Sequence, residues 1–218
     1  MNDNSSLAPT ENPILVVFEG VDRSGKTTLS QALAKVLHYD WGKYPKISTE
    51  EADRLNDPNT VIDETVRESF FVKGMIQGNR GPQSSRNTVL DRYLWTGVAY
   101  AKQFSPSMVP FLRSLYSDPT VFKPADITIF LDTDPSVCVK RDSSLAIDTV
   151  RSIRNNFLSE LTHLTPVLGR TLILPYSGQS VDQLVQEVSD FVYPLIHNTL
   201  RKSISPSDDT GTGKAGGI

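Results

Sequence analysis

Residues 16–28 read Val-Val-Phe-Glu-Gly-Val-Asp-Arg-Ser-Gly-Lys-Thr-Thr. An apolar run over Ile14–Phe18 leads into a GxxxxGKT loop, Gly20–Thr27, and a helical pattern of apolar residues follows over Lys26–Leu37. Glycines let the backbone curl so that successive N–H groups face phosphate oxygens, and the N-terminal end of the next helix adds partial positive charge. This strand–loop–helix order therefore predicts a nucleotide phosphate site, where an isolated Gly/Ser turn would not.

Within this loop, two side chains have chemical roles that follow from the motif. Lys26 is expected to reach the terminal phosphates, and the Thr27 hydroxyl is expected to ligate Mg²⁺. The loop residues predicted to bind ATP are Gly20, Arg23, Ser24, Gly25, Lys26, Thr27 and Thr28.

The chain has 218 residues, of which 38% are hydrophobic, and this suits one α/β domain. Its net charge of −3 argues against duplex nucleic acid as the main ligand. Cys138 is the only cysteine, so nothing requires an oxidising compartment. No apolar run approaches the ~20 residues that span a bilayer. These features predict a cytoplasmic protein without nucleic-acid or membrane partners.

Polar, low-complexity ends flank the predicted domain. Residues 1–12 and 203–218 are expected to be disordered tails, and 13–202 to form a single domain.

Apolar runs typical of strands alternate with helical patterns along this domain. The expected strands are Ile14–Phe18, Thr88–Leu90, Ile127–Leu131 and Thr171–Leu174, with a weak fifth near Lys46–Thr49. The expected helices are Lys26–Leu37, Val61–Ile76, Leu94–Gln103, Ser107–Leu115, Ser136–Arg141, Ile147–Leu164 and Val181–Leu200. The alternation predicts an α/β fold with a five-stranded parallel sheet, helices on both faces and ligands at the carboxyl ends of the strands.

A second motif, Asp91-Arg92-Tyr93, ends the strand near Leu90. An acid just beyond an apolar strand can order Mg²⁺ and its waters, so Asp91 joins Thr27 as a candidate metal residue. Arg92 offers a planar fork for a second phosphate. A strand-end salt bridge would account for the triplet alone, but its place after a phosphate loop favours function.

Taken together, the segments FEGVDRSGKTT and DRYLWTGVAY resemble those of the thymidylate kinase family, P-loop kinases that transfer the terminal phosphate of ATP to a deoxynucleoside monophosphate. The segment Ile129–Pro135 is similar to the strand that precedes the family's mobile lid, and Tyr176–Val181 is similar to the loop that lies beside adenine in the family. The resemblance implies a Mg²⁺-dependent kinase, most similar to the eukaryotic and viral type that carries an arginine in the phosphate loop; a viral or phage origin is compatible with it. It also implies a homodimer and nucleotides as small-molecule partners.

The resemblance further implies roles for single residues. Arg23, Lys26, Asp91 and Arg92 would be catalytic, with Arg23 bridging donor and acceptor phosphates. Asp22 would accept a hydrogen bond from the sugar 3′-hydroxyl, and Tyr100 would crowd the 2′ position. Arg141 and Gln179 would contact ATP. The acceptor-binding set is Asp22, Pro45, Phe71, Lys73, Arg92, Tyr93, Gly97 and Tyr100.

The lid is expected at about 141–147 and contains no arginine between Arg141 and Ile147. Bacterial-type relatives carry arginines in a longer lid, so Arg23 becomes the expected charge stabiliser here. Arg141, Arg151 and Arg154 flank the lid. One of them is expected to contact phosphates when the lid closes, and an ordinary solvated helix face is an equal alternative for each.

Two departures from the family pattern leave the base open. The arginine after Tyr44-Pro45 is missing, so Lys43 or Lys46 is expected to replace it. The family's Phe-x-x-x-Arg is also absent, because Met75 stands four residues after Phe71. Lys73 is the first candidate for the missing donor, with Gln77 and Arg80 as alternatives.

The sequence therefore predicts a deoxynucleoside monophosphate kinase with dTMP as the favoured acceptor. The alternatives are dUMP, a 5-substituted dUMP or dCMP as acceptor. A nucleoside kinase fits less well, because Arg92 would lack an acceptor phosphate. A slowly hydrolysing regulatory protein would use the phosphate loop but would not need an acceptor pocket.

Overall fold

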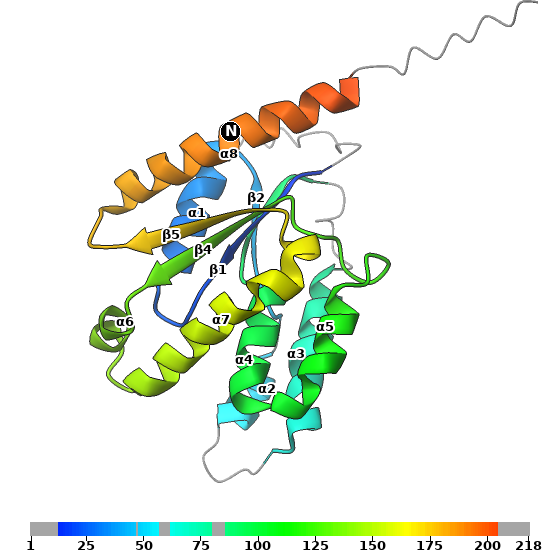
Figure 1. The fold of residues 1–218 in the computed structure, drawn as a ribbon, viewed down its shortest axis with the longest axis vertical. Coiled ribbons are helices and arrows are strands. Elements are labelled where there is room, and N and C mark those ends of the chain that lie inside the picture. The colour runs from blue at the N-terminus through cyan, green and yellow to red at the C-terminus, as the bar shows by residue number, and fades with distance from the viewer. Residues whose placement is uncertain (1–12, 47, 57–61, 80–85, 205–218) are drawn as a thin grey trace, which may run out of the picture.

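The computed structural model describes residues 13–46, 48–56, 62–79 and 86–204. Five parallel strands form one sheet in the order β2-β3-β1-β4-β5 (Figure 1). The strands are β1 (Leu15–Glu19), β2 (Asp40–Lys43), β3 (Thr88–Asp91), β4 (Ile127–Thr133) and β5 (Arg170–Tyr176). The predicted α/β fold with a five-stranded parallel sheet is confirmed.

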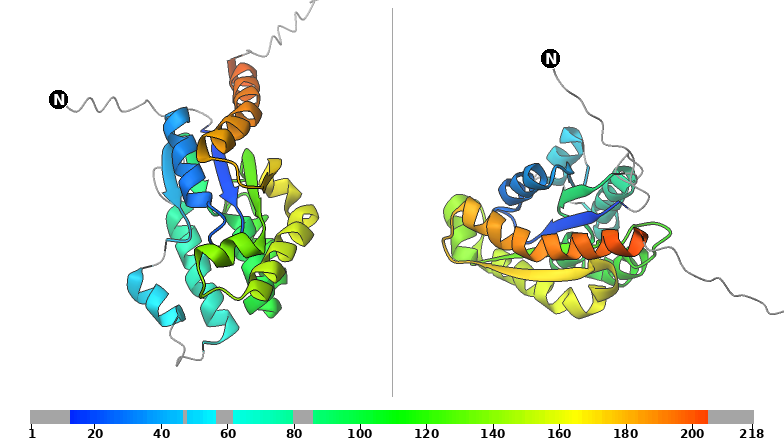
Figure 2. Two further views of the ribbon diagram at one scale, coloured as in Figure 1. Left: turned by 90° about the vertical axis from the view of Figure 1, so that its left-hand side faces the viewer. Right: turned by 90° about the horizontal axis from the view of Figure 1, so that it is seen from above.

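Helices cover both faces of this sheet (Figures 1 and 2). One face carries α1 (Lys26–Leu37) and α8 (Val181–Ile204). The other carries α4 (Leu94–Phe104) and α7 (Ile147–Leu168), with α3 (Glu64–Asn79) and α5 (Val109–Tyr116) beside α4. The short elements are α2 (Thr49–Asn56), α6 (Pro135–Arg141) and the 3-10 turn Pro106–Met108.

The two cores follow from the alternation of side chains along β1. Val16 and Phe18 point toward α1 and α8, whereas Leu15 and Val17 point toward α4 and α7. Every residue of β1 is buried. A strand buried on both faces reads as a continuous apolar run, which is why it could be recognised from the sequence.

The expected fifth strand was misplaced. The sequence suggested Lys46–Thr49, but the strand is Asp40–Lys43, and α2 begins at Thr49. β2 is an edge strand with polar residues and one buried position, Gly42. Its extended form depends on pairing with β3, from Asp40 opposite Thr88 onward, and local sequence does not show such a partner.

The other predicted elements are present, most of them with shifted ends. The predicted bounds Lys26–Leu37 match α1. The helix α3 begins at Glu64, three residues after the predicted start at Val61, which lies outside the described residues. The helix α7 continues to Leu168 with Pro166 inside it.

The ends of the chain are only partly described. The helix α8 runs to Ile204, two residues beyond the predicted end of the domain. The predicted tail at 1–12 lies outside the described residues. Of the predicted tail at 203–218, the first two residues belong to α8 and the rest lies outside the described residues. Within the described part of the chain, no helix has the length and apolarity needed to cross a membrane.

Candidate active site

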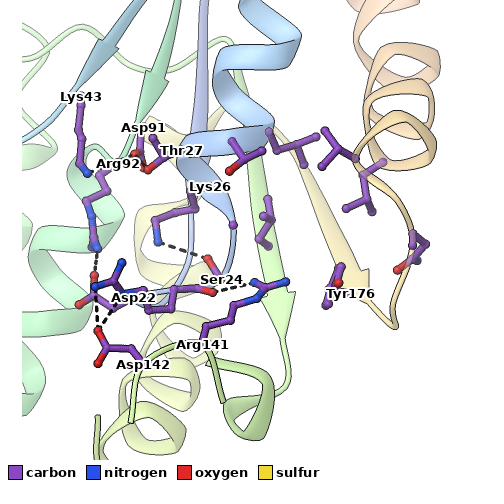
Figure 3. Close-up of a pocket in the computed structure, with 18 of the residues that line it drawn as sticks. Asp22, Ser24, Lys26, Thr27, Lys43, Asp91, Arg92, Arg141, Asp142 and Tyr176 are labelled. Carbon is purple, nitrogen blue, oxygen red and sulfur yellow. Dashed lines mark hydrogen bonds and ion pairs between the residues drawn. The ribbon is translucent and has the colours of Figure 1, made fainter. Parts of the chain in front are cut away.

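The phosphate loop connects the end of β1 to the first turn of α1 (Figure 3). Gly20 has a φ of 145°, and a Cβ there would lie 2.9 Å from the Leu131 carbonyl oxygen. Gly25 has a φ of 106°, which L side chains rarely adopt. Ser24 donates its N–H to Val21 O at 3.3 Å, and the Thr133 hydroxyl donates to Ser24 O at 3.2 Å. The loop is thereby fixed against the end of β4.

Lys26 lies within this loop and is 4% exposed. Its Nζ donates to Val21 O at 2.5 Å and to Ser24 Oγ at 3.3 Å. Burial, together with the nearby Arg92 charge, lowers the pKa of Lys26 to about 7, although the surrounding carboxylates oppose this. A phosphate beside this amine would restore the ammonium form.

Thr27, in the first turn of α1, lies next to Asp91, the last residue of β3. The Thr27 hydroxyl donates to Asp91 Oδ2 at 2.5 Å, and Lys43 Nζ lies 3.8 Å from the same oxygen. The other oxygen, Oδ1, is buried and has no hydrogen-bond partner among the described residues. A hydroxyl and one carboxylate with a free oxygen fit Mg²⁺, which is held by few protein ligands plus water and phosphate. No cluster of three or more His, Cys, Asp or Glu side chains suited to a metal occurs in the described part of the chain.

Arg92 follows Asp91 with a φ of 72°, and its side chain turns back toward the phosphate loop. It forms an ion pair with Asp22 and lies over the Tyr100 ring at 5.3 Å. The Tyr100 hydroxyl donates to Asp22 Oδ2 at 2.8 Å and accepts from Asp22 N at 3.0 Å. Burial favours protonation of Asp22, but the Arg92 and Lys26 charges outweigh it and lower the pKa of Asp22. The acid is therefore held as a carboxylate against the Arg92 guanidinium.

A first cavity of about 750 Å³ opens over the phosphate loop. Consecutive loop residues line its inner end, and Leu29, Leu131, Val181 and Leu184 supply apolar wall. At this wall the Arg141 guanidinium lies 4.9 Å from the Tyr176 ring. The predicted ATP-binding residues that line it are Arg23, Ser24, Gly25, Lys26, Thr27, Thr28, Arg141 and Gln179. Gly20 shapes the loop but does not line the cavity. We call this space the donor cavity.

A second cavity, of about 610 Å³, lies on the other side of Arg92 between α3, α4 and α7. Its aromatic wall residues are Tyr44, Phe71, Tyr93, Tyr100, Phe104 and Tyr116. The predicted acceptor-binding residues on its wall are Asp22, Pro45, Phe71, Arg92, Tyr93, Gly97 and Tyr100. We call this space the acceptor cavity.

The two cavities share four wall residues, namely Asp22, Lys43, Arg92 and Leu145. Of the two lysines that could replace the missing arginine after Tyr44-Pro45, Lys43 therefore lies at the junction. Lys46 is exposed, lies 5.7 Å from the Tyr44 ring, and lines neither cavity. The lysine charge at the junction therefore comes from Lys43, the last residue of β2.

The segment between α6 and α7 closes the outer side of the junction. Arg23 is directed toward this segment, and its guanidinium nitrogens lie 2.8–2.9 Å from Asp142 Oδ2. Arg141 donates to Arg23 O at 2.8 Å. Arg154 forms a bidentate pair with Asp132, and Arg151 forms an ion pair with Asp148, so Arg141 is the flanking arginine that reaches the donor cavity.

One predicted acceptor residue, Lys73, is not on the wall of the acceptor cavity. It lies on the exposed side of α3, where its Nζ is 2.7 Å from Glu51 Oε1. Gln77 is also exposed, and Arg80 lies outside the described residues. The charged residues of α3 that do line the cavity are Arg67 and Glu68. The sequence could have indicated Arg67, because it stands four residues before Phe71 and so lies one helical turn away on the same side of α3.

Sequence reasoning also missed the role of Glu19, which is fully buried at the end of β1. Its carboxylate accepts from the backbone N–H groups of Tyr93 at 3.0 Å and Trp95 at 3.1 Å, and from the Thr96 hydroxyl. Burial raises the pKa of Glu19 to about 7, against the Thr96 hydrogen bonds and the Arg92 and Lys26 charges. It ties the phosphate loop to the start of α4.

The chain is similar to known thymidylate kinases in sequence and in fold. The family model described as thymidylate kinase matches residues 18–163. A thymidylate kinase of Leptospira borgpetersenii is 25% identical over 183 residues, covering 70% of this chain and 84% of that protein. A thymidylate kinase of Caenorhabditis elegans is 30% identical over 160 residues, covering 59% of this chain and 66% of that protein.

Solved structures show the same fold at lower identity. Thymidylate kinase from Candida albicans aligns with a TM-score of 0.67 at 20% identity, covering 84% of this chain and 92% of that one. Deoxyadenosine kinase from M. mycoides aligns with a TM-score of 0.66 at 12% identity, covering 83% of this chain and 100% of that one.

Proposed function

The chain belongs to the thymidylate kinase family, and from that premise we propose that it transfers the terminal phosphate of ATP to dTMP, giving dTDP and ADP. The observation that carries the proposal is the junction between two cavities. An ATP in the donor cavity and a nucleoside monophosphate in the acceptor cavity would meet at Asp22, Lys43 and Arg92. A kinase must bring the donor and acceptor phosphates together in line, and two adjoining cavities allow this. A nucleotide switch protein has no use for a second cavity.

The reaction joins an oxygen of the acceptor phosphate to the γ-phosphorus as the bond from that phosphorus to the ADP oxygen breaks. Charge then spreads over the transferred group and must be neutralised. Lys26 would hold the β- and γ-phosphates, and Arg92 would hold the acceptor phosphate. Arg23 would leave Asp142 and place its guanidinium against the transferred group.

Mg²⁺ is the cofactor that we propose, held by the Thr27 hydroxyl and, directly or through water, by the free Oδ1 of Asp91. When bound, it would neutralise phosphate charge on the donor side. Removal of Mg²⁺ with EDTA should abolish ADP release. Asp91→Asn should raise the Mg²⁺ concentration that gives half-maximal rate by roughly tenfold. Asp40→Asn, an exposed acid at the start of β2, is the matched control.

Tyr100 and Asp22 would hold the sugar. The Tyr100 ring would contact the 2′ position, and the carboxylate of Asp22 would accept from the 3′-hydroxyl. Phe71 would stack on the base from α3, at the position where a planar ring suits any pyrimidine.

We also propose a homodimer. The support is family analogy and two exposed apolar side chains, Val66 on α3 and Phe111 on α5, which are 46% and 52% exposed. Light scattering over a range of concentrations tests it, and a concentration-independent monomer contradicts it without affecting the chemistry.

A coupled ADP-release assay tests the function. The panel contains dTMP, dUMP, dCMP, dAMP, thymidine and a sample with ATP alone. We expect the highest kcat/KM with dTMP and almost no release with thymidine or with ATP alone. Equal release with and without acceptor would contradict a kinase and favour a regulatory protein. Faster release with thymidine than with dTMP would favour a nucleoside kinase.

A further inference from the structure

One face of α3 forms the deep wall of the acceptor cavity. Arg67, Phe71 and Met75 follow one another at intervals of four residues, and Glu68 lies beside Arg67. Residues four apart lie on the same side of a helix, one turn above another. The stacking ring of Phe71 is therefore flanked by a charged turn on one side and by Met75 on the other.

This order reverses the family's Phe-x-x-x-Arg pattern. Met75 occupies the position of the expected arginine and is 2% exposed. Arg67 lies one turn on the other side of Phe71, about 6 Å along the helix axis. Among the described residues Arg67 forms no salt bridge, whereas Lys73 on the outer side of α3 is paired with Glu51. The free guanidinium on the cavity wall is that of Arg67.

Glu68 is a buried acid on the same wall and is 3% exposed. Burial raises the pKa of Glu68, and the Ser105 hydroxyl and Arg67 charge oppose the rise. Nearby on the wall, the Tyr116 hydroxyl is fully buried and has no hydrogen-bond partner among the described residues. Buried polar groups are costly unless something bonds to them, and in this cavity a ligand can do so.

We propose that Arg67 and Glu68 are the specificity-determining pair that reads the base, with Arg67 donating to O4 and Glu68 accepting from N3–H of thymine or uracil. The inference rests on the proposed function, since it assumes a pyrimidine monophosphate in the acceptor cavity.

The base edge decides which pyrimidine fits this pair. A 4-oxo pyrimidine presents an acceptor, O4, next to a donor, N3–H, and thus complements a guanidinium beside a carboxylate. Cytosine in the same orientation presents its 4-amino group to Arg67 and the lone pair of N3 to Glu68. Arg67 would then face a second donor and Glu68 would face a second acceptor, so neither contact could form a hydrogen bond. Stacking on Phe71 and the sugar contacts of Tyr100 fix the base orientation, so cytosine is rejected by two mismatches.

Two conservative variants test the pair. Arg67→Met removes the donor to O4 and the clash with the cytosine amino group. Glu68→Gln keeps the shape but supplies an amide that can donate to the cytosine N3. Each variant should lower the ratio of kcat/KM for dTMP to that for dCMP by roughly tenfold or more. The change should be mainly in KM, because stacking and phosphate contacts remain. Arg86→Met, an exposed arginine paired with Asp40 away from both cavities, is the matched control.

The outcomes separate this inference from the function on which it rests. Absence of phosphorylation of any pyrimidine monophosphate by the unmodified protein would refute the proposed function itself. Suppose that the unmodified protein is active and that both variants keep its melting temperature and its ratio of kcat/KM for dTMP to that for dCMP. The proposed roles of Arg67 and Glu68 would then be wrong, while the proposed function would stand. A large loss of dTMP use in Lys73→Met with none in Arg67→Met would overturn it as well, and so would dCMP as the best substrate of the unmodified protein.

Discussion

The donor and acceptor cavities meet at Arg92 but are built from different material. Consecutive residues from Asp22 to Leu29 line the donor cavity. The acceptor cavity is lined by side chains from α3, α4, α5 and α7, many of them aromatic. Phosphate is recognised by N–H groups and charge, whereas a nucleoside is recognised by ring faces and base edges. Donor-side substitutions should therefore change the rate with every acceptor, and acceptor-side substitutions should change which acceptor is preferred.

The largest expected effect is at Lys26. Lys26→Met removes the buried ammonium and should lower turnover by roughly 10³-fold with every acceptor, while weakening ATP binding. Steady-state kinetics with dTMP and dUMP would measure both. A loss for one acceptor only would contradict the division between the two cavities.

The same lysine predicts a pH dependence of ATP binding. Since the pKa of Lys26 is lowered to about 7 in the free protein, the ammonium is lost as pH rises above 7. ATP needs the charged form, so its dissociation constant should increase between pH 7 and 9. The Lys26→Met variant should lack that increase.

The next effect concerns Arg23. Arg23→Ala should lower turnover by roughly 10²-fold with little change in KM for ATP, because its charge acts on the transferred group. Asp142→Asn removes the partner of Arg23 and keeps the arginine, so it should retain most of the turnover. If Arg23→Ala raised KM for ATP with turnover intact, the catalytic role would be wrong.

The contrast between the cavities also explains what the sequence could predict. The phosphate loop and α1 form a contiguous segment whose glycines, lysine and threonine carry their meaning in their spacing. The motif Asp91-Arg92-Tyr93 is likewise local. By contrast, β2 is extended because it pairs with β3, and its polar residues do not indicate a strand. The sequence could have separated Arg67 from Lys73, because Arg67 lies one helical turn before Phe71 on the same side of α3, whereas Lys73 stands two residues after Phe71 and faces another way.

A smaller effect is expected at the sugar. Tyr100→Ala removes the ring that we propose contacts the 2′ position, and it should narrow the preference for dTMP over ribothymidine monophosphate by about tenfold. Tyr100→Phe keeps the ring but loses the hydrogen bonds to Asp22, so it should retain the preference while raising KM. Equal rates on both nucleotides in the unmodified protein would refute steric selection.

The smallest effect on the choice of acceptor concerns Glu19, which lines neither cavity and accepts from the backbone N–H groups of Tyr93 and Trp95. Burial raises the pKa of Glu19 from 4.5 to about 7. The folded protein therefore binds a proton that the unfolded chain releases at lower pH. Stability from this group is fully present below pH 4.5 and is lost as pH rises through 7, by at most about 3 kcal/mol.

Glu19→Gln isolates this contribution, because the amide keeps an acceptor for both N–H groups but does not titrate. The unmodified protein should lose free energy of unfolding relative to the variant as pH rises from 5 to 8, as measured by urea denaturation. The dTMP-to-dCMP ratio should stay the same in Glu19→Gln, since Glu19 lines neither cavity. A free-energy difference that is constant over this pH range would mean that the three donors around Glu19 keep it ionised despite its burial. Glu19 would then connect the phosphate loop to α4 through hydrogen bonds to a charged carboxylate at every pH at which the enzyme works.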